Sequence, residues 1–96
     1  MDEGIIELIH RRRRQALVHS ILYYEMNANT VPDHVFDAWA HELAELQIAH
    51  PQESAAVEYM RDEFKDWTGD GGSHLPLLEP KAYAIALLLT KGLTNE

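Results

Sequence analysis

A short link between two helical patterns is the feature that most limits how this 96-residue chain can fold. Apolar residues recur at helical spacing both before Asn27 and after Pro32, and only the segment 27–32 separates the two patterns. So short a link returns the chain antiparallel to itself. We therefore predict a helical hairpin in which the residues on either side of the link meet at one end.

The two helices of this hairpin have recognisable start and stop signals. We predict the first over about residues 3–26, with Asp2 as its N-cap. The second is predicted over about 34–49, with Asp33 as its N-cap and His50-Pro51 as its end.

Two further helices are predicted after the hairpin. The third spans about residues 52–66, and a Gly-rich loop follows over 67–79. The last begins at Pro80 and ends at Lys91-Gly92; it is apolar nearly all round, so we expect it to be the most buried element. The loop ends in an apolar segment, and we expect three leucines there to pack across the bundle: Leu75, Leu77 and Leu78.

These patterns predict an all-α single domain over residues 1–96, an antiparallel helical hairpin (1–51) extended by residues 52–96 to a small four-helix domain. The apolar fraction of 46% is typical of a folded protein, and the absence of cysteine excludes disulfides. No stretch approaches the 18 apolar residues of a membrane span, and the charged N-terminus does not look like a signal peptide. We expect a cytoplasmic protein with no membrane contact.

The net charge of −8 arises wholly from residues 27–96, where twelve acids face four bases. The only basic patch is Arg11 to Arg14, whereas nucleic-acid binding needs several cations per footprint. We therefore expect no direct nucleic-acid binding. The acidic surface favours solubility, and it is also compatible with nucleic-acid mimicry, in which the protein binds a basic partner protein.

The hairpin gathers aromatic rings and carboxylates at its linked end. Tyr23 and Tyr24 close the first helical pattern, and Asp33, Phe36 and Asp37 open the second. These five residues form a candidate binding cup. A purely structural interpretation is also available, in which the rings close the hairpin and the two acids cap and support a helix start.

Residues 19–51 resemble the small N-terminal helical domain of bacterial NAD-dependent DNA ligases. The resemblance rests on the tyrosine pair, the short loop, the Asp33-x-x-Phe36-Asp37 box, the Leu43-containing segment and the closing His50-Pro51. In those ligases this domain stacks the pyridinium ring of nicotinamide mononucleotide (NMN) between two tyrosines, contacts the phosphate through a histidine and uses two aspartates near the ribose.

The resemblance implies that Tyr23 and Phe36 stack the ring, with Asp33 and Asp37 beside it. A flat cation suits two ring faces next to carboxylates on physical grounds as well. Two positions depart from the ligase pattern: Phe36 replaces a tyrosine, and Tyr24 replaces the phosphate-contacting histidine. We consider Arg12 and Arg13 as phosphate contacts in its place, with a solvated, salt-bridged turn as the alternative.

The ligase nucleophile motif Lys-x-Asp-Gly does not occur in these residues, so we expect neither self-adenylation nor DNA joining. Short ligase-related chains of this kind resemble phage-encoded proteins, which implies a host cytoplasm. We read the histidines, including His34 and His41 near Asp37, as surface residues and predict no metal site or cofactor. The 67–79 loop is interpreted as a flexible turn; a lid over the cup built from Trp67 and His74 is the alternative.

The leading functional hypothesis is non-catalytic binding of a nicotinamide- or ADP-ribose-type nucleotide, such as NMN, NAD or ADP-ribose, for sequestering or sensing. The first alternative is an acidic inhibitor that binds a host or defence protein, using the following acids: Glu42, Glu45, Asp62 and Glu63. The second is an enzyme that hydrolyses or transfers a nucleotide, although no catalytic set is legible. The oligomeric state is left open.

Overall fold

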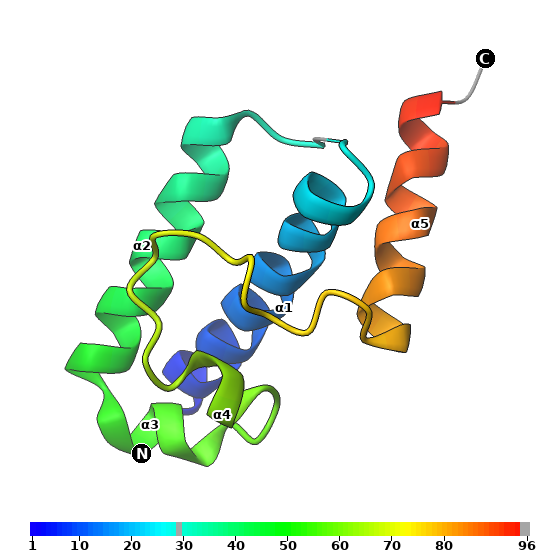
Figure 1. Ribbon diagram of the computed structural model, residues 1–96. Helices are drawn as coiled ribbons and strands as arrows, with labels where there is room; N and C mark the ends of the chain where they lie inside the picture. The colour runs from blue at the N-terminus through cyan, green and yellow to red at the C-terminus, as the bar shows by residue number, and fades with distance from the viewer. Residues whose placement is uncertain (29, 95–96) are drawn as a thin grey trace.

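The computed structural model describes residues 1–28 and 30–94 as an all-helical domain without strands (Figure 1). Its helices are α1 (Glu3–Glu25), α2 (Asp33–Ala49), α3 (Pro51–Ala56), α4 (Arg61–Phe64) and α5 (Pro80–Thr94). The central element is α1, which packs against α2, α3 and α5. Figure 1 shows α1 and α2 as the predicted antiparallel pair, with α5 on the other side of α1. Asn29 of the link and residues 95–96 lie outside the described residues.

The α1–α2 hairpin is confirmed, together with the N-cap of its first helix. The Asp2 side chain accepts hydrogen bonds from the amides of Gly4 (2.9 Å) and Ile5 (3.2 Å). At the other end of α1, the Ala28 amide donates to the carbonyl of Leu22 at 2.8 Å, and Asn27 takes a left-handed conformation with φ of 49°. This turn ends α1 directly after its tyrosine pair.

The start of α2 differs from the prediction. The helix begins at Asp33 itself, Pro32 occupies the N-cap position, and no side-chain hydrogen bond caps the helix. The Asp33 carboxylate is therefore not consumed as a cap. The predicted stop is confirmed, since α2 ends at Ala49 and Pro51 opens α3.

The predicted continuous helix over 52–66 is wrong, because the chain breaks it into α3 and α4. Val57 is extended and Met60 is left-handed, with φ of 54°. The buried guanidinium of Arg13 supplies a physical reason. It donates to the carbonyls of Ser54 (3.0 Å), Val57 (2.9 Å) and Tyr59 (2.9 Å), which an uninterrupted helix would use for its own backbone ladder.

The last helix is not the most buried element. Among its described side chains only the small ones of Ala82 and Ala86 are fully buried, and Tyr83 packs partly buried against the core. The larger side chains of α5 remain partly or largely exposed, and they are Ile85, Leu87, Leu88 and Leu89. The backbone also remains helical past Lys91-Gly92, to Thr94.

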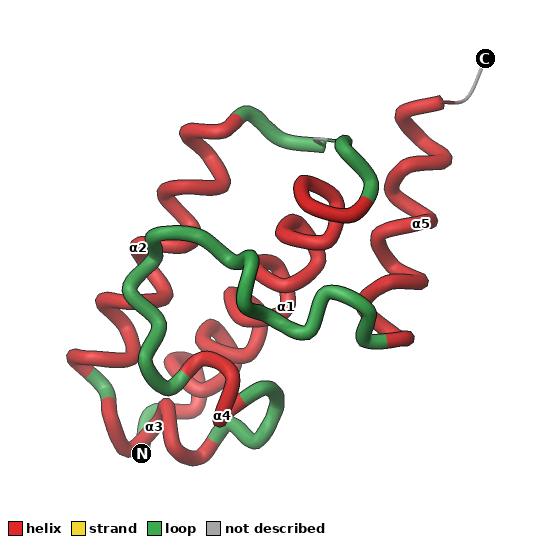
Figure 2. Tube along the Cα trace, viewed as in Figure 1, coloured by secondary structure: helices red, strands yellow, loops and turns green. Residues whose placement is uncertain are grey.

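The segment between α4 and α5 is an ordered loop that crosses the hairpin (Figure 2). Leu75 is buried and Leu77 packs against the core, as predicted, whereas Leu78 is 70% exposed. The core surrounds α1 and takes side chains from α2, α4, α5 and this loop, and its largest fully buried apolar side chains are Ile9, Leu17, Ile21, Leu22, Leu43 and Phe64. Within the described ranges, no helix is both long enough and apolar enough to cross a membrane.

Candidate functional site

A cavity of about 370 Å³ lies at the linked end of the hairpin, where the end of α1, the start of α2 and the Gly-rich loop converge. We call it the hairpin cavity. It is lined by His19, Ser20, Tyr23, Tyr24, Thr30, Val31, Asp33, Phe36, Asp37, His41, Gly69, Asp70, Gly71 and Gly72. The five residues of the predicted cup are all in this lining, although they come from two helices. The structure thus brings together the side chains that the sequence singled out.

The aromatic residues form one open and one sheltered wall. Tyr23 and Tyr24 are 55% and 44% exposed, and their rings meet edge to face at 4.9 Å between centroids. Phe36 is half-buried on α2, with its ring 6.1 Å from that of His19. No ring contact joins Tyr23 to Phe36 in the described part of the chain. The rings of the predicted stacking pair, Tyr23 and Phe36, therefore do not pack against each other.

The carboxylates of Asp33 and Asp37 form no hydrogen bond or ion pair with any described residue. Asp70 brings a third carboxylate from the loop, 3.6 Å from Nε2 of His41. Nδ1 of His41 lies 2.8 Å from the carbonyl oxygen of Asp37. A carbonyl only accepts, so this bond fixes a proton on Nδ1 and directs Nε2 toward the loop.

His19 is a lining residue that sequence analysis missed. Its Nδ1 lies 3.2 Å from the hydroxyl of Thr30, and its ring packs 5.4 Å from that of Trp39. Desolvation by burial lowers the pKa of His19 below its ordinary value of 6.5. The imidazole is therefore neutral at pH 7 and adds no positive charge to the cavity.

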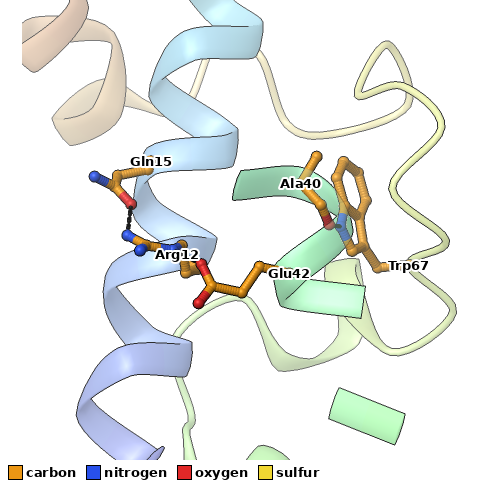
Figure 3. Close-up of polar contacts among 5 residues, drawn as sticks. All are labelled: Arg12, Gln15, Ala40, Glu42 and Trp67. Carbon is orange, nitrogen blue, oxygen red and sulfur yellow. Dashed lines mark hydrogen bonds and ion pairs between the residues drawn. The ribbon is translucent and has the colours of Figure 1, made fainter. Parts of the chain in front are cut away.

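The Gly-rich loop forms one wall of the cavity. The indole Nε1–H of Trp67 donates to the carbonyl of Ala40 at 2.9 Å, and the Trp67 side chain is buried (Figure 3). This contact anchors the loop to α2, and neither Trp67 nor His74 lines the cavity, so the alternative of a lid built from these two residues is wrong. Gly69 follows with φ of +89°, and a Cβ there would meet Ala40 and His41 within 3.2 Å. Only glycine fits this close approach.

Gly72 brings the loop against α1 in the same way. A Cβ on Gly72 would lie 2.1 Å from the hydroxyl oxygen of Ser20. Ser20 is 1% exposed, and its hydroxyl has no hydrogen-bond partner among the described residues. A buried polar group without a partner is uncommon in folded proteins. The sequence held a partial signal for this contact, because a Gly-Gly pair permits close approach, but nothing in it identified Ser20 as the neighbour.

The prediction of Arg13 as a phosphate contact is wrong. Arg13 is 1% exposed and donates five hydrogen bonds, all to neutral acceptors. Besides the three carbonyls near α3, these acceptors are the side-chain oxygens of Gln47 and Ser54. Burial, and then the charge of Arg61, lower the pKa of Arg13, yet a guanidinium remains protonated in proteins. Every donor of this side chain is used inside the core.

Arg12 is also engaged away from the hairpin cavity (Figure 3). Its Nε donates to the carboxylate of Glu42 at 2.6 Å, and its NH1 donates to Gln15 at 2.6 Å. The guanidinium carbon lies 5.8 Å from the ring centroid of Trp39. These contacts hold α1 against α2, so the predicted phosphate role is corrected for Arg12 as well.

Neither the arrangement of possible metal ligands nor the comparisons with known proteins assigns a function to the site. Over residues 1–28 and 30–94, no group of three or more His, Asp or Glu side chains is arranged to hold a metal ion. No family model matches the sequence, and no solved structure matches the chain. The resemblance to NAD-dependent DNA ligases therefore rests on residues 19–51 alone.

Proposed function

We propose that this chain binds a nicotinamide- or ADP-ribose-type nucleotide in the hairpin cavity, without catalysing a reaction on it. The observation that supports the proposal most strongly is the convergence of Tyr23, Tyr24, Asp33, Phe36 and Asp37 on one cavity. The ligase resemblance assigns four of them to the ligand, and Tyr24 stands at the position of the phosphate-contacting histidine. A core-packing role alone would not leave the two tyrosines about half exposed.

The size and chemistry of the cavity agree with such a ligand. Small-molecule pockets span about 300–1,000 Å³, and a cavity of about 370 Å³ is at the lower end of that range. It suits one ring and its sugar rather than a whole dinucleotide. Exposed ring faces next to carboxylates favour a flat cation, with an attraction of about 0.5–2 kcal/mol per contact.

The test is a calorimetric titration of the protein with NMN, NAD and ADP-ribose. We expect saturable binding of at least one of them, and we expect Tyr23→Ala to weaken it about tenfold, because one ring contact in the upper part of this energy range is lost. Ile48→Ala is the matched control, since Ile48 is 79% exposed and does not line the cavity. Circular dichroism should show unchanged helix content in both variants.

The absence of heat from all three nucleotides at millimolar concentration would reject the proposal. Equal weakening of binding by Tyr23→Ala and Ile48→Ala would also reject this location of the site, since only one of these residues lines the cavity.

A further inference from the structure

The outer side of α5 carries a cluster of exposed apolar side chains. Figure 1 shows this helix at the edge of the domain, beside α1. Five of the nine large apolar side chains that are exposed in the described residues lie on α5 or just before it, and they are Leu78, Ile85, Leu87, Leu88 and Leu89. Single exposed apolar residues are ordinary on a protein surface, whereas a contiguous cluster marks a docking site.

The outermost residues of α5 form a helical strip. They recur at intervals of three and four positions, which places them on one side of the helix: Ala84, Leu87, Leu88 and Lys91. We call these four residues the α5 strip. All of them are exposed, whereas Ala82 and Ala86 on the opposite side are buried. The large side chains thus point away from the core, the reverse of the arrangement that stabilises an isolated amphipathic helix.

A hollow of about 310 Å³ opens beside the α5 strip. It is lined by Leu78, Pro80, Tyr83, Ala84 and Leu87, so its walls are aliphatic side chains and one phenol ring. Walls of this kind suit an apolar side chain from another molecule, as when a knob of one helix enters a hole between residues of a facing helix.

The charge of α5 is opposite to that of the whole chain. Its charged residues are Lys81 and Lys91, whereas the net charge of the chain is −8. Both lysines are exposed, and neither ammonium group forms an ion pair or hydrogen bond with a described residue. Glu79, which directly precedes α5, accepts a hydrogen bond from the amide of Ala82 at 2.8 Å and so caps the helix. An unpaired cation therefore lies near each end of the apolar surface.

This charge distribution distinguishes the possible occupants of the α5 strip. In an antiparallel twofold pairing of two copies of α5, Lys81 of one copy would approach Lys91 of the other, between two bodies that each carry a charge of −8. An anionic membrane would be repelled by the same net charge, and two lysines are few for lipid binding. An amphipathic helix with carboxylates at the ends of its apolar face matches both the strip and the lysines.

We propose that the α5 strip docks an acidic amphipathic helix of a partner protein. A leucine-sized side chain of that helix enters the hollow, and its carboxylates pair with Lys81 and Lys91, which are about 15 Å apart along the helix axis at a rise of about 1.5 Å per residue. The hollow shares no lining residue with the hairpin cavity, so this interaction is independent of nucleotide binding.

Three labelled helical peptides test the proposal by fluorescence anisotropy. They share one leucine face and differ only at two flanking positions, ten residues apart, which are Glu, Gln or Lys. The net charge of −8 alone would favour the Lys peptide, whereas the two lysines of α5 favour the Glu peptide. At about 0.15 M salt, where charges more than about 8 Å away are screened, we expect the Glu peptide to bind at least about fivefold more tightly than the Lys peptide.

Two pairs of variants locate the binding surface. Leu88→Gln should weaken binding of the Glu peptide about tenfold, whereas Ile48→Gln, at an exposed residue of α2, should leave it unchanged. Lys81→Glu combined with Lys91→Glu should reverse the preference for the Glu peptide over the Lys peptide. Lys65→Glu, at an exposed lysine outside α5, should not reverse it. Circular dichroism should show unchanged helix content in every variant.

Equal binding of the Glu and Lys peptides, or no binding of the Glu peptide at about 1 mM, would overturn the proposal. A dimer in light scattering that Leu88→Gln abolishes would assign the strip to a second copy of the chain instead. Binding to vesicles of phosphatidylcholine and phosphatidylglycerol that Leu88→Gln abolishes would assign it to a membrane surface.

Discussion

The two ends of the α1–α2 hairpin satisfy their polar groups in opposite ways. Near α3 and α4, the buried Arg13 pairs all of its donors with neutral acceptors from Ser54, Gln47 and two further carbonyls. At the linked end, Ser20 has an unpaired hydroxyl, and two aspartates lack partners within the described residues. A fully paired buried polar network specifies structure, whereas the two aspartates at the linked end are exposed and their carboxylates face solvent.

Removing the centre of the fully paired network should produce the largest effect. Arg13→Met leaves buried carbonyls without a donor and should lower the free energy of unfolding by about 3–5 kcal/mol. Arg14→Met provides the control, because Arg14 is exposed and should change stability by less than about 0.5 kcal/mol. Urea unfolding followed by circular dichroism measures both. Similar stabilities for the two variants would show that Arg13 does not organise this end.

The wall of the cavity should be sensitive to a single added carbon. In Gly72→Ala the new Cβ would lie 2.1 Å from the Ser20 hydroxyl and 3.0 Å from a methyl group of Leu75. Such overpacking typically costs about 1–3 kcal/mol. We expect the double variant Ser20→Ala/Gly72→Ala to lose less stability than Gly72→Ala alone, because the closest contact is gone. Additive effects in this double-mutant cycle would mean that the loop does not press on α1 at Ser20.

Ser54 and Ser20 allow the same serine-to-alanine substitution to be compared at the two ends of the hairpin. Ser54→Ala removes an acceptor of the Arg13 guanidinium, at 2.9 Å, and should cost about 1–2 kcal/mol. Ser20→Ala removes an unpaired hydroxyl and should leave stability unchanged or raise it by about 1 kcal/mol. Both serines are helical, so the higher helix propensity of alanine contributes to both variants. Equal changes in the chemical-denaturation midpoint would show that the hydroxyls of Ser54 and Ser20 do not differ in their contribution to stability.

The smallest effect should be a pH dependence contributed by His19. Its pKa is lowered in the folded protein, so the unfolded chain takes up the proton first as the pH falls through 6.5. The contribution of His19 to the free energy of unfolding is therefore fully present above pH 6.5, and it declines as the pH falls below that value. Stability should fall less between about pH 7.5 and about pH 5.5 in His19→Gln than in the unmodified protein.

Local sequence signals predicted the hairpin and missed the contacts made across it. The short 27–32 link and the Asp2 cap act within a few residues, so both are legible in the sequence. The break at Val57 to Met60 depends on Arg13, more than forty positions earlier in the chain, which periodicity cannot reveal. The apolar pattern of α5 likewise gave no indication that, among its described side chains, only alanines would be fully buried.

The candidate site shows the same division between local and distant signals. The cup residues flank one short link, so the sequence alone predicted that they lie close together. Asp70 and Gly72 join them through tertiary contacts of the loop, such as that of Trp67 with α2 at Ala40. That tertiary contact leaves no spacing signal in the chain.

An NMR titration of the isotopically labelled protein with nicotinamide mononucleotide, monitored at the backbone amides, tests the location of the site most directly. We expect the largest shifts at Tyr23, Tyr24, 33–37 and 69–72, while the Nε–H resonance of Arg13 stays in place. Shifts concentrated on α5 or around Arg13, or no shifts at millimolar ligand, would contradict a ligand site at the linked end of the hairpin.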